Sequence, residues 1–125
     1  MAGFAVRYLV DDVASAVAFY RDLLGFTVAM DFSPGFAAVE LDGSTLYLNG
    51  VGGPGGASQP MPDGSVPGPG GWNRIQLVVD DLDGEARRLR ELGARFRNEI
   101  VVGRGGSQVL MDDPSGNPVE LFQPG

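Results

Sequence analysis

The sequence contains no cysteine and no histidine among its 125 residues. Without cysteine it can form no disulfide and no thiolate nucleophile, and we therefore expect a cytoplasmic protein. Without histidine it lacks the commonest general base near neutral pH and the commonest metal-binding side chain. Nucleophilic sites of the Ser-His-Asp or Cys-His type are therefore excluded.

The sequence also lacks an excess of positive charge and any long apolar run. Its 9 basic residues face 16 acidic ones, which gives a net charge of -7. This balance argues against a nucleic-acid partner, because phosphates require a basic surface. No apolar stretch approaches the roughly 20 residues of a membrane span, and the N-terminus lacks a signal-peptide layout. With 43% apolar residues, the chain is expected to form one globular domain with no membrane partner.

One cassette occurs twice, in residues 7–25 and 75–93. Each copy joins an apolar run of strand length, a pair of aspartates, a stretch with helical periodicity and a Leu-Gly ending. The second aspartate of each pair, Asp12 or Asp81, suits a helix start, because its carboxylate accepts hydrogen bonds from unpaired backbone N–H groups. The glycine suits the helix end, where a left-handed residue is common. The repeat indicates a duplicated module.

The remaining pattern completes two modules of the same order. In the first strand, residues 4–10, Val6, Tyr8 and Val10 share the side that should pack on the helix, which leaves Arg7 on the opposite face. Asp42-Gly43 predicts a tight hairpin turn. The expected helices are residues 14–24 and 83–92, and the expected strands are residues 4–10, 26–31, 35–41, 44–49, 72–79, 95–99, 106–111 and 118–123. This gives two βαβββ modules, residues 1–50 and 72–125, joined by a connector or lid rich in glycine and proline at 51–71.

Two segments carry a family resemblance. Residues 18–26 read AFYRDLLGF, and residues 113–122 read DPSGNPVELF. Together with the tandem βαβββ order, they resemble the vicinal oxygen chelate superfamily. Its members include glyoxalase I, extradiol dioxygenases, fosfomycin resistance enzymes and bleomycin resistance proteins. The resemblance covers essentially the whole chain and implies an α+β fold in which both modules form a curved mixed sheet around a cavity.

The resemblance also indicates where a metal would bind. In metal-dependent members each module supplies one ligand from its first strand and one from its last. The matching positions here are Ala5, Tyr47, Arg74 and Glu120. Alanine offers no donor atom, arginine is a cation and neutral tyrosine is a poor ligand, so a single carboxylate remains where three or four ligands are needed. We therefore expect no metal and no other cofactor, as in the bleomycin resistance branch.

A ligand pocket is expected around these positions. Arg74 and Glu120 are predicted to form a bidentate ion pair, which either only neutralises charge or helps Arg74 and Arg7 to anchor an anionic or carbonyl group. Val78 shares the same face. Phe32 and Phe36 could line the pocket, although for them and for Trp72 a core or interface role is the alternative. The predicted ligand-binding residues are Arg7, Leu9, Tyr47, Asn49, Trp72, Arg74, Gln76, Glu120 and Phe122.

Several functions agree with this pattern. The first is a binding protein that sequesters or carries an aromatic or peptide-like compound, in antibiotic resistance or natural-product handling. The resemblance implies that it forms a homodimer. The second is a metal-independent isomerase or lyase that uses Glu120 as general base and Tyr47 or Arg74 to stabilise an oxyanion. The third is a metal-dependent lyase or dioxygenase with other ligands, such as Glu40 and Asp112, and the fourth is a scaffold without a ligand.

Overall fold

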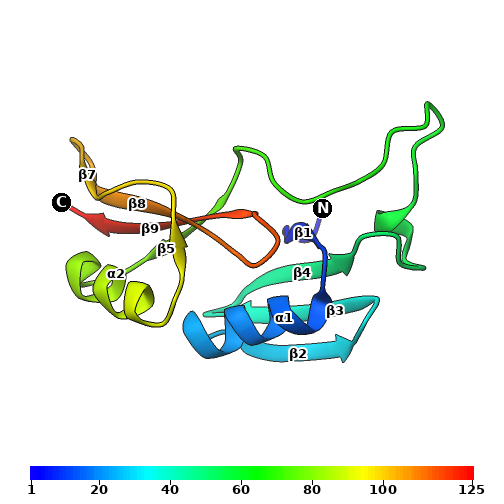
Figure 1. Cartoon of the computed structure of the whole chain (residues 1–125), viewed down its shortest axis with the longest axis horizontal. Helices are drawn as coiled ribbons and strands as arrows, with labels where there is room; N and C mark the ends of the chain where they lie inside the picture. Colours follow the sequence, from blue (N-terminus) through cyan, green and yellow to red (C-terminus); the bar gives the residue numbers. More distant parts are fainter. The chain divides into compact units, whose positions relative to one another are not determined.

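The computed structural model describes residues 1–125 and divides them into two compact units, Met1–Pro69 and Gly70–Gly125 (Figure 1). Each unit contains its own mixed sheet and its own α-helix. The boundary between the units falls near the end of the predicted connector. No helix of the chain is long and apolar enough to cross a membrane.

The first unit contains a four-stranded sheet in the order β1-β4-β3-β2. β1 runs parallel to β4, whereas β3 is antiparallel to both β4 and β2. The predicted hairpin turn is confirmed, because Asp42 and Gly43 both adopt the left-handed conformation with φ of 48° and 82°. The strands are β1 (Val6–Val10), β2 (Thr27–Phe32), β3 (Phe36–Leu41) and β4 (Ser44–Gly50).

The helix of this unit begins as predicted and ends differently. Asp12 caps α1 (Val13–Ala18), because its Oδ1 accepts a hydrogen bond of 3.1 Å from the backbone N–H of Ser15. The continuation, η1 (Phe19–Leu23), is π-helical rather than α-helical. The wider turn buries Phe19 beside Tyr20, whereas Leu23 and Leu24 at the end of the predicted helix are only half-buried.

The second unit repeats the order with one additional strand. β5 runs parallel to β9, and the sheet order is β5-β9-β8-β6 with β7 also paired to β8. Asp81 caps the helix through a 3.1 Å hydrogen bond from the backbone N–H of Gly84. The elements are β5 (Ile75–Val78), α2 (Leu82–Glu91), β6 (Arg95–Phe96), β7 (Val101–Val102), β8 (Gly106–Asp112) and β9 (Pro118–Pro124).

Two strand predictions in this unit need correction. The first strand begins at Ile75 rather than at residue 72, so Trp72 precedes it. The strand predicted at 95–99 ends after Phe96, and the short β7 follows it. Asn98 accounts for the interruption, because its side-chain Oδ1 accepts the hydrogen bond from the backbone N–H of Leu110 that a strand carbonyl would otherwise accept.

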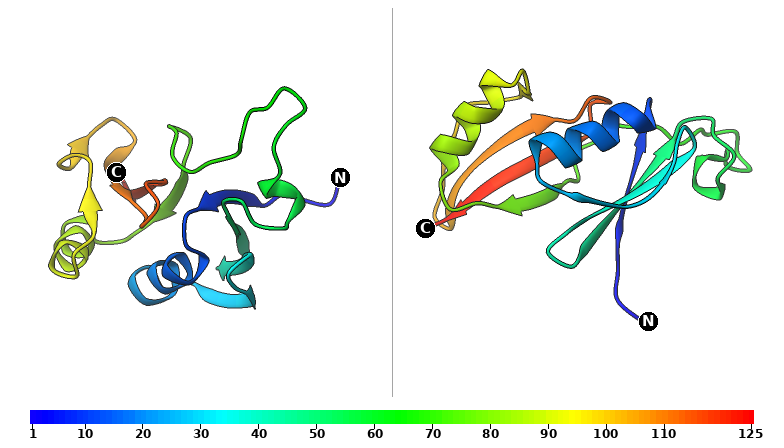
Figure 2. Two further views of the ribbon diagram at one scale, coloured as in Figure 1. Left: turned by 45° about the vertical axis from the view of Figure 1, so that its right-hand side comes forward. Right: turned by 90° about the horizontal axis from the view of Figure 1, so that it is seen from below.

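Each sheet has a face covered by its own helix and an opposite face, called here the open face (Figure 2). The alternation predicted for residues 4–10 is confirmed, because Tyr8 and Val10 are buried and Arg7 is exposed on the open face. The covered faces hold the two apolar cores, which contain Tyr8, Val10, Val39, Leu46 and Leu48 in the first unit and Val109, Met111, Val119, Leu121 and Leu89 in the second.

The start of the glycine-rich segment is folded onto β4. A single 3-10 turn, η2 (Gly56–Ser58), buries the side chain of Ser58, whose Oγ donates a 2.8 Å hydrogen bond to the carbonyl of Gly50. A Cβ on Gly55 would lie 3.2 Å from Nδ2 of Asn49, so this backbone passes close over that amide. The segment therefore covers the end of the first unit's open face.

Candidate functional site

On the open face of the second unit, three polar side chains form a group that we call the Glu120 cluster: Arg74, Gln76 and Glu120. Nε and Nη2 of Arg74 lie 3.0 and 2.9 Å from Oε1 of Glu120, and Nε2 of Gln76 lies 2.7 Å from Oε2. The predicted ion pair is therefore present, but both arginine donors share one oxygen because Gln76 occupies the other. The side chain of Glu120 is only 7% exposed, whereas that of Arg74 is 24% exposed.

Trp72 lies at the edge of the Glu120 cluster. Its ring centroid is 6.0 Å from Cζ of Arg74, and its carbonyl accepts a 3.4 Å hydrogen bond from Nη1 of the same arginine. The residue is 73% exposed, so it has no core role within the unit. Phe32 is 66% exposed and has no core role either, whereas the predicted interface role of both residues stays a prediction. The Trp72 ring is therefore available as a flat apolar surface beside a polar group.

On the open face of the first unit, four side chains form the Arg7 cluster: Arg7, Phe36, Tyr47 and Asn49. Nη1 of Arg7 donates a 2.7 Å hydrogen bond to Oδ1 of Asn49, and Cζ of Arg7 lies 5.1 Å from the Tyr47 ring centroid. The rings of Phe36 and Tyr47 are 5.7 Å apart and tilted by 36°. Asn49 is buried, Phe36 and Tyr47 are half-buried, and Arg7 is exposed.

The strand registers show that the two clusters occupy equivalent positions in their units. Arg7 pairs with Tyr47 across β1 and β4, and Gln76 pairs with Glu120 across β5 and β9. Tyr47 is therefore the counterpart of Glu120. Arg7 is likewise the counterpart of Gln76. Ala5 precedes Arg7 by two residues, as Arg74 precedes Gln76, so Ala5 is the counterpart of Arg74. The registers therefore agree with the correspondence predicted from the sequence.

The four residues at the positions suggested for a metal are a poor donor set. Ala5 has no donor atom, and Arg74 places a cation 2.9 Å from Glu120. Both oxygens of Glu120 already accept hydrogen bonds, so a divalent ion would compete with Arg74 and Gln76 for this carboxylate. Within either unit, no group of three acidic side chains lies close enough to hold an ion.

The other predicted residues lie beside these clusters. Leu9 is half-buried and pairs with Asn49, whereas Phe122 is half-buried and pairs with the exposed Val78. The sequence interpretation missed two residues of β8, Gln108 and Leu110, which pair with Phe122 and Glu120 and share their face. The turn-forming residues Asp-Pro-Ser-Gly-Asn at 113–117 could have identified both, because the turn sets the register of the last hairpin.

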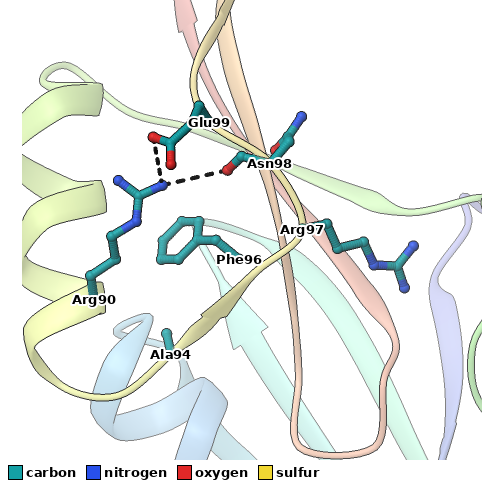
Figure 3. Close-up of a pocket in the computed structure, with 6 residues that line it drawn as sticks. All are labelled: Arg90, Ala94, Phe96, Arg97, Asn98 and Glu99. Carbon is teal, nitrogen blue, oxygen red and sulfur yellow. Dashed lines mark hydrogen bonds and ion pairs between the residues drawn. The ribbon is translucent and has the colours of Figure 1, made fainter.

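A separate open depression of about 390 Å³ lies between α2 and β6 in the second unit (Figure 3). Cζ of Arg90 lies 4.5 Å from the Phe96 ring centroid, and its Nη2 lies 3.4 Å from both Glu99 and the Asn98 carbonyl. Arg97 pairs with Asp112. Because both arginines already have acidic partners, this depression offers a ligand no unneutralised charge, and we do not assign it a function.

Comparisons with solved structures show the same fold over nearly the whole chain. Lactoylglutathione lyase from Agrobacterium tumefaciens matches with a TM-score of 0.73 at 22% identity and covers 98% of this chain and 94% of its own. An antibiotic-binding protein, TnmS3 from Streptomyces sp. CB03234, matches with a TM-score of 0.70 at 27% identity, covering 100% and 99%. A superfamily member from Sphaerobacter thermophilus matches with a TM-score of 0.73 at 26% identity, covering 98% of each chain.

The sequence comparisons identify the family. No curated protein matches the chain by sequence. The sequence model described as the Glyoxalase/Bleomycin resistance protein/Dioxygenase superfamily matches residues 4–121, which includes both units and both clusters. The chain belongs to the glyoxalase/bleomycin resistance protein/dioxygenase superfamily.

Proposed function

We propose that this protein is a metal-free binding protein of the superfamily that sequesters or carries an aromatic or peptide-like small molecule. The state of Glu120 carries this proposal. It is the only carboxylate among the four candidate metal positions, it is nearly buried, and both of its oxygens accept hydrogen bonds from Arg74 or Gln76. A carboxylate held in this way orients its neighbours rather than binding a cation.

The same contacts favour binding over catalysis. A general base must come within hydrogen-bond distance of the proton that it removes. Glu120 is nearly buried and already accepts three hydrogen bonds from Arg74 and Gln76, and the chain has no histidine to take the role instead. The isomerase or lyase hypothesis therefore ranks second.

The open faces offer the surfaces that a flat ligand needs. Phe36 and Tyr47 form an aromatic pair in one unit, and Trp72 and Phe122 supply exposed or half-buried rings in the other. Small-molecule sites combine such apolar walls with a few polar groups that orient the ligand. The similarity to the antibiotic-binding protein TnmS3 supports a natural product as the ligand. We also propose a homodimer, which light scattering tests directly.

Binding can be measured through Trp72, the only tryptophan of the chain. Titration with flavonoids, anthraquinones and bleomycin should produce a saturable change in its fluorescence for at least one compound class. Trp72→Phe removes this signal, so calorimetry of the same variant shows whether binding itself persists. The compound should be recovered unchanged by mass spectrometry. Conversion of a bound compound that Glu120→Gln abolishes would establish an enzyme in place of a carrier.

A further inference from the structure

Arg7 is the only basic side chain of the first unit without an acidic partner there. Residues 1–69 contain no lysine and only two arginines, Arg7 and Arg21. Arg21 pairs with Asp22 at 2.7 Å, whereas none of the unit's acidic side chains lies within ion-pair distance of Arg7. An acidic unit thus presents one unneutralised cation on its open face, beside two aromatic rings.

The guanidinium of Arg7 is oriented although it is exposed. The buried Asn49 accepts a hydrogen bond from Nη1 of Arg7, and the Tyr47 ring centroid lies 5.1 Å from Cζ of Arg7. No other hydrogen bond from Arg7 forms within the unit, so Nε and Nη2 remain available. A planar guanidinium with two free donors matches the two oxygens of a carboxylate. Because Asn49 and Tyr47 already restrict the Arg7 side chain, ligand binding would cost little of its conformational entropy.

Arg74 cannot take this role as readily. Two of its nitrogens donate to Glu120 and the third donates to the carbonyl of Trp72. An anion placed there would meet the charge of Glu120 at short range. Of the two arginines predicted from the sequence to anchor an anionic group, only Arg7 is therefore free to do so within its unit.

We propose that Arg7 binds the carboxylate of an aromatic acid whose ring packs against Tyr47 and Phe36. This inference rests on the proposed binding function and specifies its ligand class. The rings of the two residues supply the apolar contact, and Asn49 positions the arginine. Carboxylates elsewhere on the unit repel an anion, so the acid has one preferred orientation, with its charge at Arg7.

The test compares two ligands with one ring system, 9-anthracenecarboxylate and the neutral 9-anthracenemethanol, by isothermal titration calorimetry. Wild-type protein should bind the acid about tenfold more tightly than the alcohol, and added salt should reduce this preference. Arg7→Gln should remove the preference, so that acid and alcohol bind with equal affinity. Arg7→Lys, which keeps the charge but not the planar fork, should retain part of it.

Arg21→Gln is the matched control, because it removes the other arginine of the unit and should keep the full preference. Circular dichroism of each variant verifies that it is folded. Equal affinity for acid and alcohol in wild type, or a preference that survives Arg7→Gln, overturns the role of Arg7 but leaves the binding function intact. Loss of the preference in Arg74→Gln alone also overturns it. Binding of neither compound counts against both proposals.

Discussion

Two nitrogens of Arg74 converge on a single oxygen of Glu120, at 3.0 and 2.9 Å. By resemblance to the metal-dependent members of the superfamily, Glu120 lies at the position of a metal-binding carboxylate and Arg74 at the position of a second metal ligand. In this protein the guanidinium of Arg74 supplies the positive charge beside the carboxylate. The pair thus keeps the carboxylate and neutralises it from within the chain, which explains how the open face can hold a nearly buried acid.

Removing the cation should destabilise the protein. We expect Arg74→Met to lower the free energy of unfolding by about 2 kcal/mol, because Glu120 would remain buried with only Gln76 as a partner. The figure is below that for a fully buried pair because Arg74 is partly exposed. Urea denaturation measures it. Arg104→Met, at an exposed position, is the control and should change stability by less than about 0.5 kcal/mol.

Divalent metals should neither copurify with the protein nor stabilise it. A ligand that binds the native state raises the melting temperature by mass action. Addition of Zn²⁺, Ni²⁺ or Mn²⁺ should therefore leave the melting temperature unchanged, and elemental analysis should find no stoichiometric metal. A bound metal that disappears in Glu120→Gln would instead support the metal-dependent lyase or dioxygenase hypothesis.

Gly106 should not tolerate a side chain. Its φ is +152°, and an added Cβ would lie 2.1 Å from the backbone oxygen of Gln123. We expect Gly106→Ala to cost about 2 to 4 kcal/mol in thermal or urea unfolding, because the β8–β9 pairing must shift. The neighbouring Gly105→Ala is the control, since its Cβ would meet only the Phe122 ring at 4.0 Å. Equal effects of both substitutions would contradict this explanation.

The helix cap of the first unit should make a measurable contribution. Asp12→Ala removes the hydrogen bond from the backbone N–H of Ser15 and should cost about 1 kcal/mol of stability. Asp12→Asn keeps an acceptor at the same position and should cost much less. Chemical denaturation measures the free energy of unfolding of both variants. If Asp12→Asn lost as much stability as Asp12→Ala, the charge of Asp12 rather than its capping hydrogen bond would be responsible.

Asp31 should titrate below its ordinary range. Hydrogen bonds from the Ser33 hydroxyl and then from the Ser33 backbone N–H lower the pKa of its carboxyl. Because the folded-state pKa is the lower one, the stabilisation is complete above the pKa of the unfolded chain and is lost as the pH falls through the folded-state pKa. In Ser33→Ala the carboxyl pKa should rise toward its ordinary value, which NMR titration measures.

Most of the fold could be predicted because its signals are local. Asp12 and Asp81 cap helices, Gly25 and Gly93 follow them in the left-handed conformation, and the Asp42-Gly43 turn is confirmed. The errors occurred where tertiary contacts override local preference. The π-helical turn after α1 lets Phe19 and Tyr20 both reach the core, and the Asn98 side chain interrupts the strand predicted at 95–99.

The positions of the candidate site and the pairing of Arg74 with Glu120 were predictable, but the other interactions of the site were not. Alternation along strands placed Arg7, Tyr47 and Glu120 on open faces, and the repeat aligned the two modules. The pattern could not show the hydrogen bonds that Gln76 donates to Glu120 and that Arg7 donates to Asn49. Gln76 takes one oxygen of Glu120, which directs both nitrogens of Arg74 to the other.

The amino-acid sequence by itself determined the duplicated architecture, the family and the absence of imidazole and thiol chemistry, because periodicity, caps and residue types are properties of the chain alone. Only the tertiary structure decided that all three guanidinium nitrogens of Arg74 donate hydrogen bonds, whereas Arg7 has no acidic partner in its unit. That difference depends on distances of a few ångströms between residues more than 40 positions apart, which strand register sets and local sequence does not encode.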